Sequence, residues 1–377
     1  MVDLIKSREA IDRIDKQIVS LFEERMDVAK DVAEYKRSTG KKVLDVKREQ
    51  EKLDTLSALA TTEFNERAVR ELFSQIMSIS RKYQYSLLAE HIVQFDEMKE
   101  LPRTKETTVC FFGARGSYSE QAMEECFGKE VTSFSAGTFK EVMEAVQEGK
   151  AEFGVLPIEN TTTGGITDSY DLLLEYDNCL IGEHIVKIEH VLLGLPDAEL
   201  SDITTVYSHS QAIGQCRKFL EEHEKIHPIV FSSTSESAKR VKNSNDKTQA
   251  AIASKRAADI YGLKVLKEYL NTEDVNSTRF IIISKKQQYL PQANKISICF
   301  ELPHESGSLY KMLSHIMYNN LNMTKIESRP IPQRNFEYRF FVDFEGKITD
   351  AAVKNTLNGI QEEASRLKVL GNIAELG

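Results

Sequence analysis

The sequence lacks the features that mark membrane-spanning, secreted and nucleic-acid-binding proteins. No apolar run among its 377 residues approaches the ~20 residues that cross a bilayer. The opening segment, MVDLIKSRE, carries charges throughout and has no apolar signal-peptide core. Basic residues number 49 against 58 acidic ones, a net charge of −9. We therefore expect a cytoplasmic protein that binds neither nucleic acid nor a membrane.

Cysteine is scarce and scattered, and no two cysteines form a Cys-x-x-Cys pair. The five thiols are Cys110, Cys126, Cys179, Cys216 and Cys299. An odd number at wide spacing argues against a disulfide framework and a cysteine metal site, so we expect buried thiols. The segment His223–His227 matches His-Glu-x-x-His, but Pro228 must end any helix there. We interpret it as a coincidence and expect neither metal nor cofactor.

The first hundred residues are predicted to be all helix. Residues 3–37 contain no Pro or Gly and predict one long helix that ends at Ser38-Thr39-Gly40. Asp45 is placed to cap a second helix, and a third apolar pattern runs from near Phe64 past Leu88. A stripe at helical spacing on the first helix is expected to be buried; it comprises Ile11, Ile14, Ile18, Leu21, Val28 and Val32. We assign an all-α domain to residues 1–97.

Three cations, Arg8, Arg25 and Lys36, fall on this apolar stripe. Buried cations are costly unless an anion meets them, so we expect either protein carboxylates or an anionic ligand there. Snorkelling or fraying at a helix end explains Arg8 and Lys36 equally well, but Arg25 lies mid-helix. Arg8 and Arg25 stand roughly 25 Å apart along the helix axis. If both serve one small ligand, one of them comes from an antiparallel partner chain, which predicts a helical dimer with two equivalent anion sites.

The middle of the chain has the pattern of an α/β domain with largely parallel strands. A charged linker spans 98–108, and a second linker lies near 285–293. Between them, helical stretches alternate with short apolar runs that we predict as strands: 109–112, 153–158, 204–207, 229–231, 250–253 and 280–283. We assign this domain to residues 107–285.

Polar segments follow several of these strands, where open α/β sheets bind ligands. They are Gly113–Ser119, Pro157–Gly165, Ser208–Gln211 with Gln215-Cys216, and Asn276–Phe280. Each segment alone also fits an ordinary turn, surface loop or helix cap. Together they supply hydroxyls and amides but few ionisable groups. No Gly-x-Ser-x-Gly occurs, and the adjacent Ser208 and His209 do not form a catalytic triad.

The last part of the chain predicts a ferredoxin-like βαββαβ domain over residues 294–377. Its expected elements are strand 295–302, helix 306–320, strands 323–330 and 338–344, helix 350–367 and a short last strand. The residues alone favour a small packing domain over a binding domain.

The helical segment resembles the chorismate mutase family over nearly all of residues 1–95. The motifs that carry the resemblance are Arg8-x-x-Ile11, Asp15, Glu24-Arg25, Lys36, Asp45-x-x-Arg48-Glu49, Ser80 and Gln84. The resemblance implies an intertwined three-helix dimer in which Arg25 and the partner's Arg8 bind the two carboxylates of chorismate. It also implies substrate binding by Asp45, Arg48 and Ser80, acceptance of the substrate hydroxyl by Glu49, and donation to the ether oxygen by Lys36 and Gln84. Such a rearrangement needs only a fixed conformer and donors where negative charge grows.

The middle segment resembles the prephenate dehydratase family over about residues 107–285. The matching motifs are Gly116–Ser119, Pro157–Asn160, Ser208–Gln211 with Gln215-Cys216, and Asn276–Phe280. Ser210 stands where the family usually has proline, and Thr161–Thr163 where serines are common. The resemblance implies a two-lobed domain that converts prephenate to phenylpyruvate, with Thr278 as the proton donor and Asn160, Ser208 and Gln215 positioning the substrate.

The tail resembles the regulatory ACT domain, which binds an amino acid and pairs between subunits. Its phenylalanine-site motifs stand here as Gly307-Ser308-Leu309 and Glu327-Ser328-Arg329-Pro330. Ser308 replaces the usual alanine. The resemblance implies that phenylalanine lowers dehydratase activity through this domain.

The three resemblances together predict a cofactor-free bifunctional enzyme of phenylalanine biosynthesis that forms a homodimer or a higher homo-oligomer. Two alternatives remain open: a dehydratase that prefers arogenate, and a non-catalytic sensor of aromatic metabolites. The sequence does not determine the oligomer size beyond a dimer, channelling between the two sites, or the strength of inhibition.

Overall fold

The computed structural model describes residues 3–88, 94–273 and 275–376. The chain forms two compact units, which we describe separately. The first comprises residues 1–94 and 298–369, and the second comprises residues 95–297 and 370–377. Two strands, β14 (Lys295–Glu301) and β17 (Arg366–Glu375), run from one unit into the other. None of the described helices has the length and apolar character that a membrane span requires.

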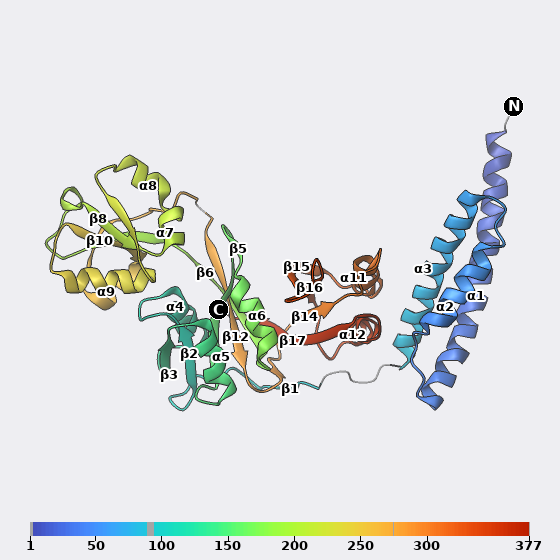
Figure 1. The fold of residues 1–377 in the computed structure, drawn as a ribbon. Helices are drawn as coiled ribbons and strands as arrows, with labels where there is room; N and C mark the ends of the chain where they lie inside the picture. The colour runs from blue at the N-terminus through green and yellow to red at the C-terminus, as the bar shows by residue number, and fades with distance from the viewer. Residues whose placement is uncertain (1–2, 89–93, 274, 377) are drawn as a thin grey trace. The chain divides into compact units, whose positions relative to one another are not determined.

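The first unit begins with three helices at the predicted places (Figure 1). Helix α1 (Leu4–Thr39) is capped by Asp3 and ends at Gly40, whose φ of 65° is left-handed. Helix α2 (Val46–Ser57) is capped by the Asp45 side chain, which accepts from the Arg48 N–H. Helix α3 (Glu63–Leu88) packs against both. The all-helical prediction is confirmed for the described part of this segment.

The predicted burial of the α1 stripe is wrong for the single chain. Its six members, Ile11 to Val32, are 40–65% exposed. In this chain α1 buries only Ala29 and Ala33, and its first turns extend past the start of α3 (Figure 1). The apolar face of α1 is therefore open to solvent in the single chain, because no element within residues 3–88, 94–273 and 275–376 covers it.

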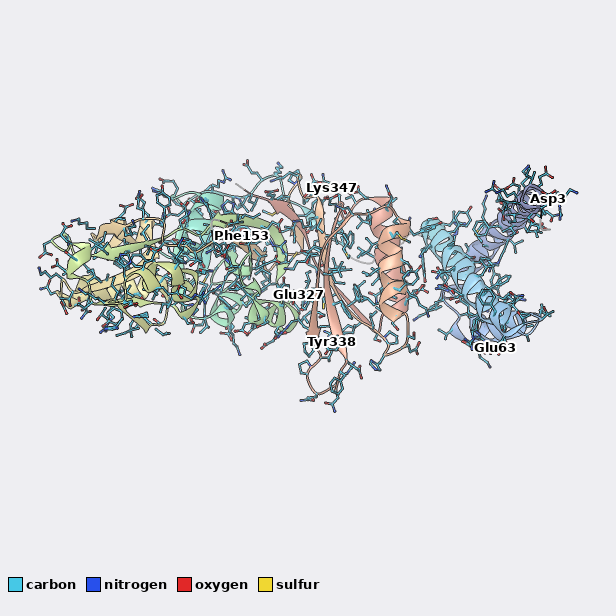
Figure 2. The ribbon with its side chains drawn as sticks, turned by 90° about the horizontal axis from the view of Figure 1, so that it is seen from above. Asp3, Glu63, Phe153, Glu327, Tyr338 and Lys347 are labelled. Atoms are coloured by element: carbon cyan, nitrogen blue, oxygen red, sulfur yellow. The ribbon has the colours of Figure 1, made fainter. Side chains whose placement is uncertain are left out.

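The second unit contains two large sheets, each in its own lobe, as predicted. The first has the order β6-β12-β4-β2-β3; the bounds are Cys179–Lys187, Ser277–Ser284, Phe153–Asn160, Thr108–Phe112 and Thr132–Ala136. A short strand β5 (Gly164–Gly165) pairs with β4. Three helices pack on this sheet: α4 (Tyr118–Phe127), α5 (Phe139–Gln147) and α6 (Thr167–Glu175). Phe153 lies fully buried in this core (Figure 2).

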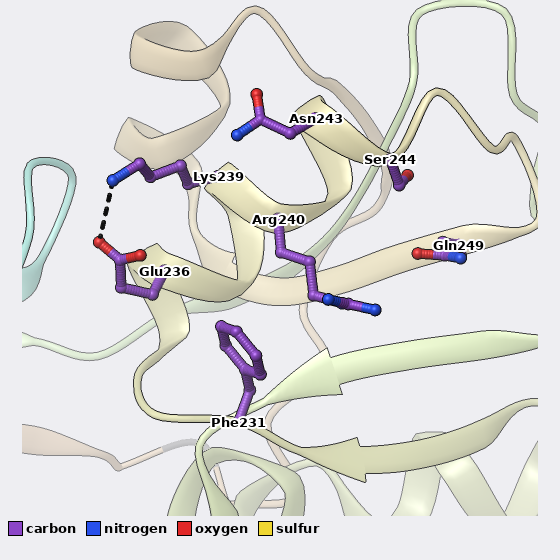
Figure 3. Close-up of a pocket in the computed structure, with 7 residues that line it drawn as sticks. All are labelled: Phe231, Glu236, Lys239, Arg240, Asn243, Ser244 and Gln249. Carbon is purple, nitrogen blue, oxygen red and sulfur yellow. Dashed lines mark ion pairs between the residues drawn. The ribbon is translucent and has the colours of Figure 1, made fainter.

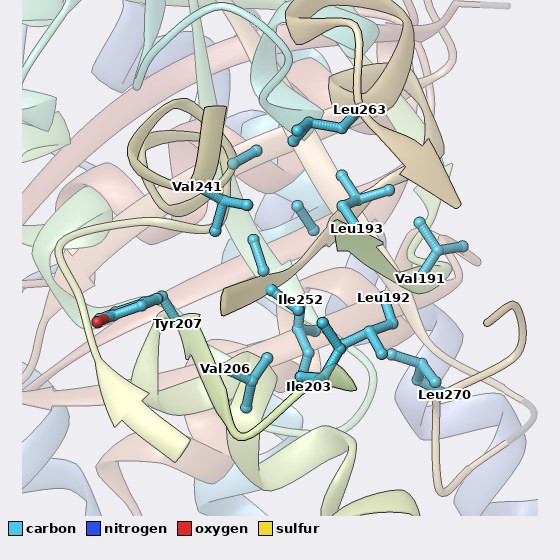
Figure 4. Close-up of a cluster of buried hydrophobic side chains, with 14 of the residues drawn as sticks. Val191, Leu192, Leu193, Ile203, Val206, Tyr207, Val241, Ile252, Leu263 and Leu270 are labelled. Atoms are coloured by element: carbon cyan, nitrogen blue, oxygen red, sulfur yellow. The ribbon is translucent and has the colours of Figure 1, made fainter. Parts of the chain in front are cut away.

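The second sheet has the order β11-β7-β10-β8-β9, with bounds Lys264–Lys267, His190–Gly194, Gln249–Ser254, Thr205–Ser208 and His227–Val230. It is surrounded by α7 (Ser210–Gln215), α8 (Arg217–Glu222), α9 (Thr234–Ser244), α10 (Lys255–Tyr261) and the 3-10 turn Leu200–Asp202. A separate apolar core, which includes Leu192, Val206 and Ile252, holds it together (Figure 4). Each lobe thus has its own core, and polar segments can lie between the two.

The prediction of largely parallel strands is wrong. Strands β2, β3 and β4 are parallel, as are β8, β9 and β10. Strand β12, however, is antiparallel to both β4 and β6, and β7 is antiparallel to β10 and β11. The chain passes from the first sheet to the second directly between β6 and β7 and returns in β12. The apolar runs predict strands but carry no information about their direction.

The two histidines of the His-Glu-x-x-His segment do not share a helix. Helix α8 ends at Glu222 with His223 as its C-cap, and His227 begins the edge strand β9. Pro228 fits that edge position because it cannot donate a ladder hydrogen bond.

The C-terminal strands have the order β15-β16-β14-β17, which is the ferredoxin-like arrangement predicted. The bounds are α11 (Ser308–Tyr318), β15 (Met323–Pro330), β16 (Tyr338–Glu345) and α12 (Ala351–Glu363). Two details differ from the prediction: α12 ends at Glu363 rather than Leu367, and the last strand is long rather than short. Strand β17 is extended because its last residues pair in parallel with β6 in the second unit. A small pair of strands, β1 (Asp96–Glu97) and β13 (Gln288–Tyr289), completes the fold.

The pairing of β17 with β6 leads to a stability prediction. Gly371 lies opposite Leu180, and a Cβ at position 371 would stand 1.9 Å from the Leu180 carbonyl oxygen. Because backbone cannot move aside easily, Gly371→Ala should destabilise the second unit by about 3 kcal/mol. Denaturant unfolding followed by circular dichroism measures this change. Gly214→Ala, in α7 with no atom within 4 Å of the added Cβ, is the control and should not lower the midpoint. Equal midpoints for the two variants would contradict the pairing.

Candidate functional site

The structure brings residues from α1, α2 and α3 together in a polar site of the first unit. Lys36 donates from Nζ to the Gln84 Oε1 at 3.1 Å and to the Val43 carbonyl at 2.6 Å. Because Gln84 Oε1 accepts from Lys36, the Gln84 amide nitrogen turns toward Ser80, whose carbonyl it reaches at 3.3 Å. Three of the predicted residues, one from α1 and two from α3, therefore form one hydrogen-bonded group.

Among the described residues, neither cation of this site is in direct ion-pair contact with an acid, although acids lie close enough to act on both through their charge. Arg25 is partly buried, and its Nη1 is buried without a hydrogen-bond partner among the described residues. Burial lowers the pKa of Arg25, and the charge of Glu49 opposes that effect. Burial likewise lowers the pKa of Lys36, against the charges of nearby acids. An orphaned, partly desolvated guanidinium is expensive unless a ligand anion meets it.

Three other predicted residues, Arg8, Asp45 and Arg48, do not belong to this hydrogen-bonded group. Arg8 is exposed on α1, seventeen positions before Arg25, and does not join the site of its own chain. Asp45 uses a side-chain oxygen to cap α2 through the Arg48 N–H at 3.1 Å. The Arg48 side chain is exposed. The single chain therefore assembles Arg25, Lys36, Ser80 and Gln84 but not Arg8.

Glu49 contacts Arg81, a residue that the sequence analysis did not single out. Its Oε2 accepts from Nη1 of Arg81 at 2.5 Å, and Arg81 is only 6% exposed. The signal available in the sequence was the charged pair Arg81-Lys82 within residues 72–88, a part of the third helix that has no other charged residue. Its meaning depends on what packs against α3, which the local sequence does not specify.

In the second unit, strands β4 and β12 place Asn160 directly opposite Thr278. The Asn160 Nδ2 donates to the Thr278 Oγ1 at 3.0 Å and to the Asn276 Oδ1 at 2.8 Å. Because Thr278 accepts from this amide, its own hydroxyl proton remains available to a ligand. The Asn276 Nδ2 is a buried donor with no partner among the described residues. Thr278 and Asn276, both bonded to the Asn160 amide, therefore each retain a donor that these hydrogen bonds do not use.

Threonines connect this group to the second lobe. The Asn160 Oδ1 accepts from the Thr162 hydroxyl at 2.6 Å, and the Thr162 oxygen in turn accepts from Gln215 Nε2 at 2.9 Å. Gln211 Nε2 donates to the Thr163 hydroxyl at 2.8 Å. The polar loop after β4 and helix α7 therefore meet across the two lobes, as the strand-end argument predicts.

His190 is a second residue that the sequence interpretation missed. Its Nε2 donates to the Gln215 Oε1 at 2.9 Å, and this bond turns the Gln215 amide nitrogen toward Thr162. The ring is 2% exposed, and burial lowers the pKa of His190 to about 4, against the Gln215 hydrogen bond. The imidazole is therefore neutral at physiological pH and acts as a fixed support. No motif surrounds His190, so only the fold identifies it.

Two groups that we expected to face a ligand already have hydrogen-bond partners within the protein. The Ser208 hydroxyl is fully buried and donates to the Ile252 carbonyl at 2.7 Å. The Gly116 N–H donates to the buried Glu120 carboxylate at 2.6 Å, and Ser117 caps α4. Of the two interpretations of the Gly113–Ser119 turn, the helix cap fits and an open anion site does not. All five cysteines are free and buried, as predicted.

The C-terminal motifs lie at the predicted elements. Gly307 precedes α11 with a left-handed φ of 79°, and the Ser308 hydroxyl donates to the Glu305 carbonyl at 2.9 Å. Residues 327–330 form the end of β15, where Figure 2 labels Glu327. A hollow of about 500 Å³ nearby is lined instead by α11 and the segment Asn320–Met323.

Another hollow, of about 380 Å³, lies on α9 in the second lobe (Figure 3). There Arg240 extends over Phe231, and its guanidinium lies 4.4 Å from the ring centre of Tyr207. It contains none of the residues bonded to Asn160 or Thr278, so we do not assign the reaction to it. Among the described residues, no three His, Cys, Asp or Glu side chains are grouped to hold a metal.

Comparison with known proteins gives one family match over each of the two segments that contain these groups. Residues 7–85 match the chorismate mutase type II family, and residues 109–288 match the prephenate dehydratase family. A bifunctional chorismate mutase/prephenate dehydratase of Stutzerimonas stutzeri is 33% identical over 371 residues, covering 97% of this chain and 96% of the relative.

Two solved structures show the same fold over 71% of this chain. The prephenate dehydratase of Arthrobacter aurescens in complex with L-Phe has a TM-score of 0.66 and 31% identity, with 90% of its own chain covered. A protein described as a quorum-quenching acylase has a TM-score of 0.65 and 29% identity, with 98% covered. The full-length likeness decides the family: the chain belongs to the bifunctional chorismate mutase/prephenate dehydratases.

Proposed function

We propose that this chain catalyses two consecutive reactions of phenylalanine biosynthesis, from chorismate to prephenate and from prephenate to phenylpyruvate. The observation that carries the proposal is the pair of unneutralised cations, Arg25 and Lys36, beside Glu49 and Gln84 in one helical site. Such a site suits a doubly negative metabolite, because an anionic ligand supplies the direct ion pairs that these two cations lack.

The mutase reaction needs no group transfer to the protein. One carbon–oxygen bond of the ether breaks while one carbon–carbon bond forms within the substrate. Arg25 binds a carboxylate, Arg48 and Ser80 support the ring end together with Asp45, and Glu49 accepts the substrate hydroxyl. Lys36 and the Gln84 amide donate to the ether oxygen, where negative charge grows in the transition state. Binding in a compact conformer supplies the rest of the acceleration.

A second copy of the chain completes this site. The apolar stripe of α1 is exposed in one chain, and Arg8 stands far along the same helix from Arg25. An antiparallel α1 from a second copy covers the stripe and brings its Arg8 to the second carboxylate of the substrate. The same symmetry creates two equivalent mutase sites in a homodimer, which can assemble further.

The dehydratase reaction takes place where Asn160 meets Thr278. The bond between the ring carbon and the departing carboxylate breaks, its electron pair enters the ring, and the ring hydroxyl leaves with its own bonding pair. Thr278 donates its proton to that hydroxyl, which departs as water, while the carboxylate leaves as carbon dioxide and the ring becomes aromatic. Solvent then returns a proton to the Thr278 oxygen. Asn160 orients Thr278, Gln215 positions the substrate from the second lobe, and Ser208 contributes by fixing the end of β8.

The C-terminal βαββαβ segment acts as an ACT regulatory domain that binds L-phenylalanine. The proposed effector site comprises Gly307-Ser308-Leu309 before and within α11, together with Glu327-Ser328-Arg329-Pro330 of β15. The L-Phe complex of the Arthrobacter aurescens relative supports this assignment. Phenylalanine would lower dehydratase activity by favouring a less active conformation.

The alternatives are weaker. A sensor without turnover has no use for the free Thr278 proton beside Asn160. An acylase needs a nucleophile, but the Ser208 hydroxyl is committed to a carbonyl, and burial raises the pKa of Cys216 to about 12. Arogenate differs from prephenate by an amino group in place of the keto group. A side-by-side assay with both substrates decides between them.

Subunit complementation tests the shared mutase site. Arg8→Ala and Arg25→Ala should each abolish mutase turnover in the homodimer. When the two proteins are mixed and allowed to exchange subunits, each heterodimer regains one intact site of two, so about a quarter of the wild-type activity should return. Mixing each variant with itself is the control. Absence of recovery despite demonstrated exchange would contradict a site built from two chains.

A substitution at Thr278 separates the two activities. Thr278→Val removes the hydroxyl but keeps the shape, so dehydratase kcat should fall at least about 100-fold while mutase kinetics stay unchanged. Thr278→Ser, which restores a donor, is the matched control and should recover most of the loss. Both activities are followed on the same purified protein. Equal loss of both would indicate misfolding rather than loss of a proton donor.

One product assay tests all three assignments. The purified protein is incubated with chorismate, and separately with prephenate, with and without phenylalanine. We expect prephenate and then phenylpyruvate from chorismate, phenylpyruvate from prephenate, and slower dehydratase turnover with phenylalanine. Glu327→Ala should retain turnover and lose the response. Dehydratase kinetics that ignore millimolar phenylalanine would overturn the regulatory assignment.

A further inference from the structure

A buried charge cluster lies within the first unit, where α3 meets α12 of the C-terminal segment. Arg81 of α3 donates from Nε to the Glu363 Oε1 at 2.8 Å and from Nη1 to the Glu49 Oε2 at 2.5 Å. The Arg81 and Glu363 side chains are 7% and 6% exposed. One guanidinium therefore connects a residue of the helical site with an acid near the other end of the chain.

Each charged group in this cluster favours the ionised form of its neighbours. Burial alone would lower the pKa of Arg81, but the charges of Glu363 and Glu49 raise it. Burial alone would raise the pKa of Glu363, but His315 and Arg81 lower it to about 2. Removing one member would leave a desolvated charge unpaired, which is costly. The geometry of Glu49 is therefore coupled to the presence of Arg81 and Glu363.

The neighbouring acid Glu362 reaches a different part of the same site. Its carboxylate accepts the backbone N–H of Val43 at 3.3 Å and of Leu44 at 2.9 Å, and the Tyr85 hydroxyl at 3.3 Å. Val43 is the residue whose carbonyl holds the Lys36 Nζ at 2.6 Å. Two adjacent glutamates at the end of α12 thus support Glu49 and Lys36 through one intervening residue each.

Tight packing fixes the position of these glutamates. His315 of α11 is 1% exposed, and its Nε2 lies 3.2 Å from Glu363. Its ring occupies the space beside Gly359 of α12, where an added Cβ would stand 2.3 Å away. On the other side Lys82, the neighbour of Arg81, donates to the Ser314 hydroxyl of α11 at 2.8 Å. The supporting elements therefore hold Glu363 in one place.

We propose that Arg81, Glu362 and Glu363 are positioning residues for the rearrangement of chorismate. Arg81 orients the Glu49 carboxylate for the substrate hydroxyl, and Glu362 fixes the segment whose carbonyl directs Lys36. The mutase reaction accordingly depends on the C-terminal segment of the same chain even without an effector. The inference rests on the proposed function, because it assigns a purpose to contacts with Glu49 and Lys36.

A double-mutant cycle in the full-length protein tests this dependence. Arg81→Gln should lower mutase kcat/KM about 10- to 100-fold, as loss of a supporting partner typically does. Arg81→Lys should recover part of the loss. In a Glu49→Gln background, Arg81→Gln should cost nothing further, because the group that it orients is already changed. Dehydratase activity of the same protein should stay unchanged throughout.

The α12 acids provide the second arm. Glu363→Gln and Glu362→Gln should each lower mutase kcat/KM, whereas Gln361→Ala, an exposed neighbour on α12, is the control and should not. Losses by Arg81→Gln and Glu49→Gln that multiply independently, or full activity of Arg81→Gln, would overturn the positioning role. A wild-type protein without mutase turnover would instead refute the proposed function.

Discussion

The constraint on which the helical site depends is the cost of burying positive charge. Arg25 and Lys36 are partly desolvated, and among the described residues neither has an ion-paired carboxylate. Arg81, a few residues away from Gln84 on α3, shows the opposite solution, with two acids against one guanidinium. The same segment therefore contains neutralised and unneutralised cations side by side. Binding of an anionic ligand lowers the energy of the cations that lack an ion pair. The site therefore favours a negatively charged ligand.

The site of the second unit depends on the orientation of neutral side chains rather than on charged groups. Asn160 is fixed by acceptors on one side and donors on the other, so its amide determines which way the Thr278 hydroxyl points. Gln215 is oriented in the same manner by His190. A hydrogen-bonded chain of neutral side chains from both lobes thereby fixes which atoms of the site donate and which accept. The Thr278 hydroxyl is thus held by a network of neutral amide and hydroxyl groups.

Most of the secondary structure could be predicted because it is locally encoded. Asp45 and Gly40 define helix ends by capping, and the apolar runs at β2, β4 and β12 define strands. Strand direction could not be predicted, because β12 returns from a distant segment. Arg81 and His190 were missed for the same reason: their roles depend on Glu363 and Gln215, which are remote in sequence. The α1 stripe shows the reverse case, where a correct pattern predicts burial that one chain alone does not provide.

The first unit is made from the two ends of the chain, residues 1–94 and 298–369, and this has a consequence during synthesis. A ribosome adds about 5–20 residues per second, so the N-terminal helices leave the exit tunnel tens of seconds before α12 exists. During that interval Arg81 has no Glu363, and Glu362 cannot hold Val43. The second unit likewise gains the pairing of β17 with β6 only after residues 371–375 have been made. Neither unit can form all of its contacts from the N-terminal part of the chain alone, because the first needs residues 298–369 and the second needs the pairing of β17 with β6.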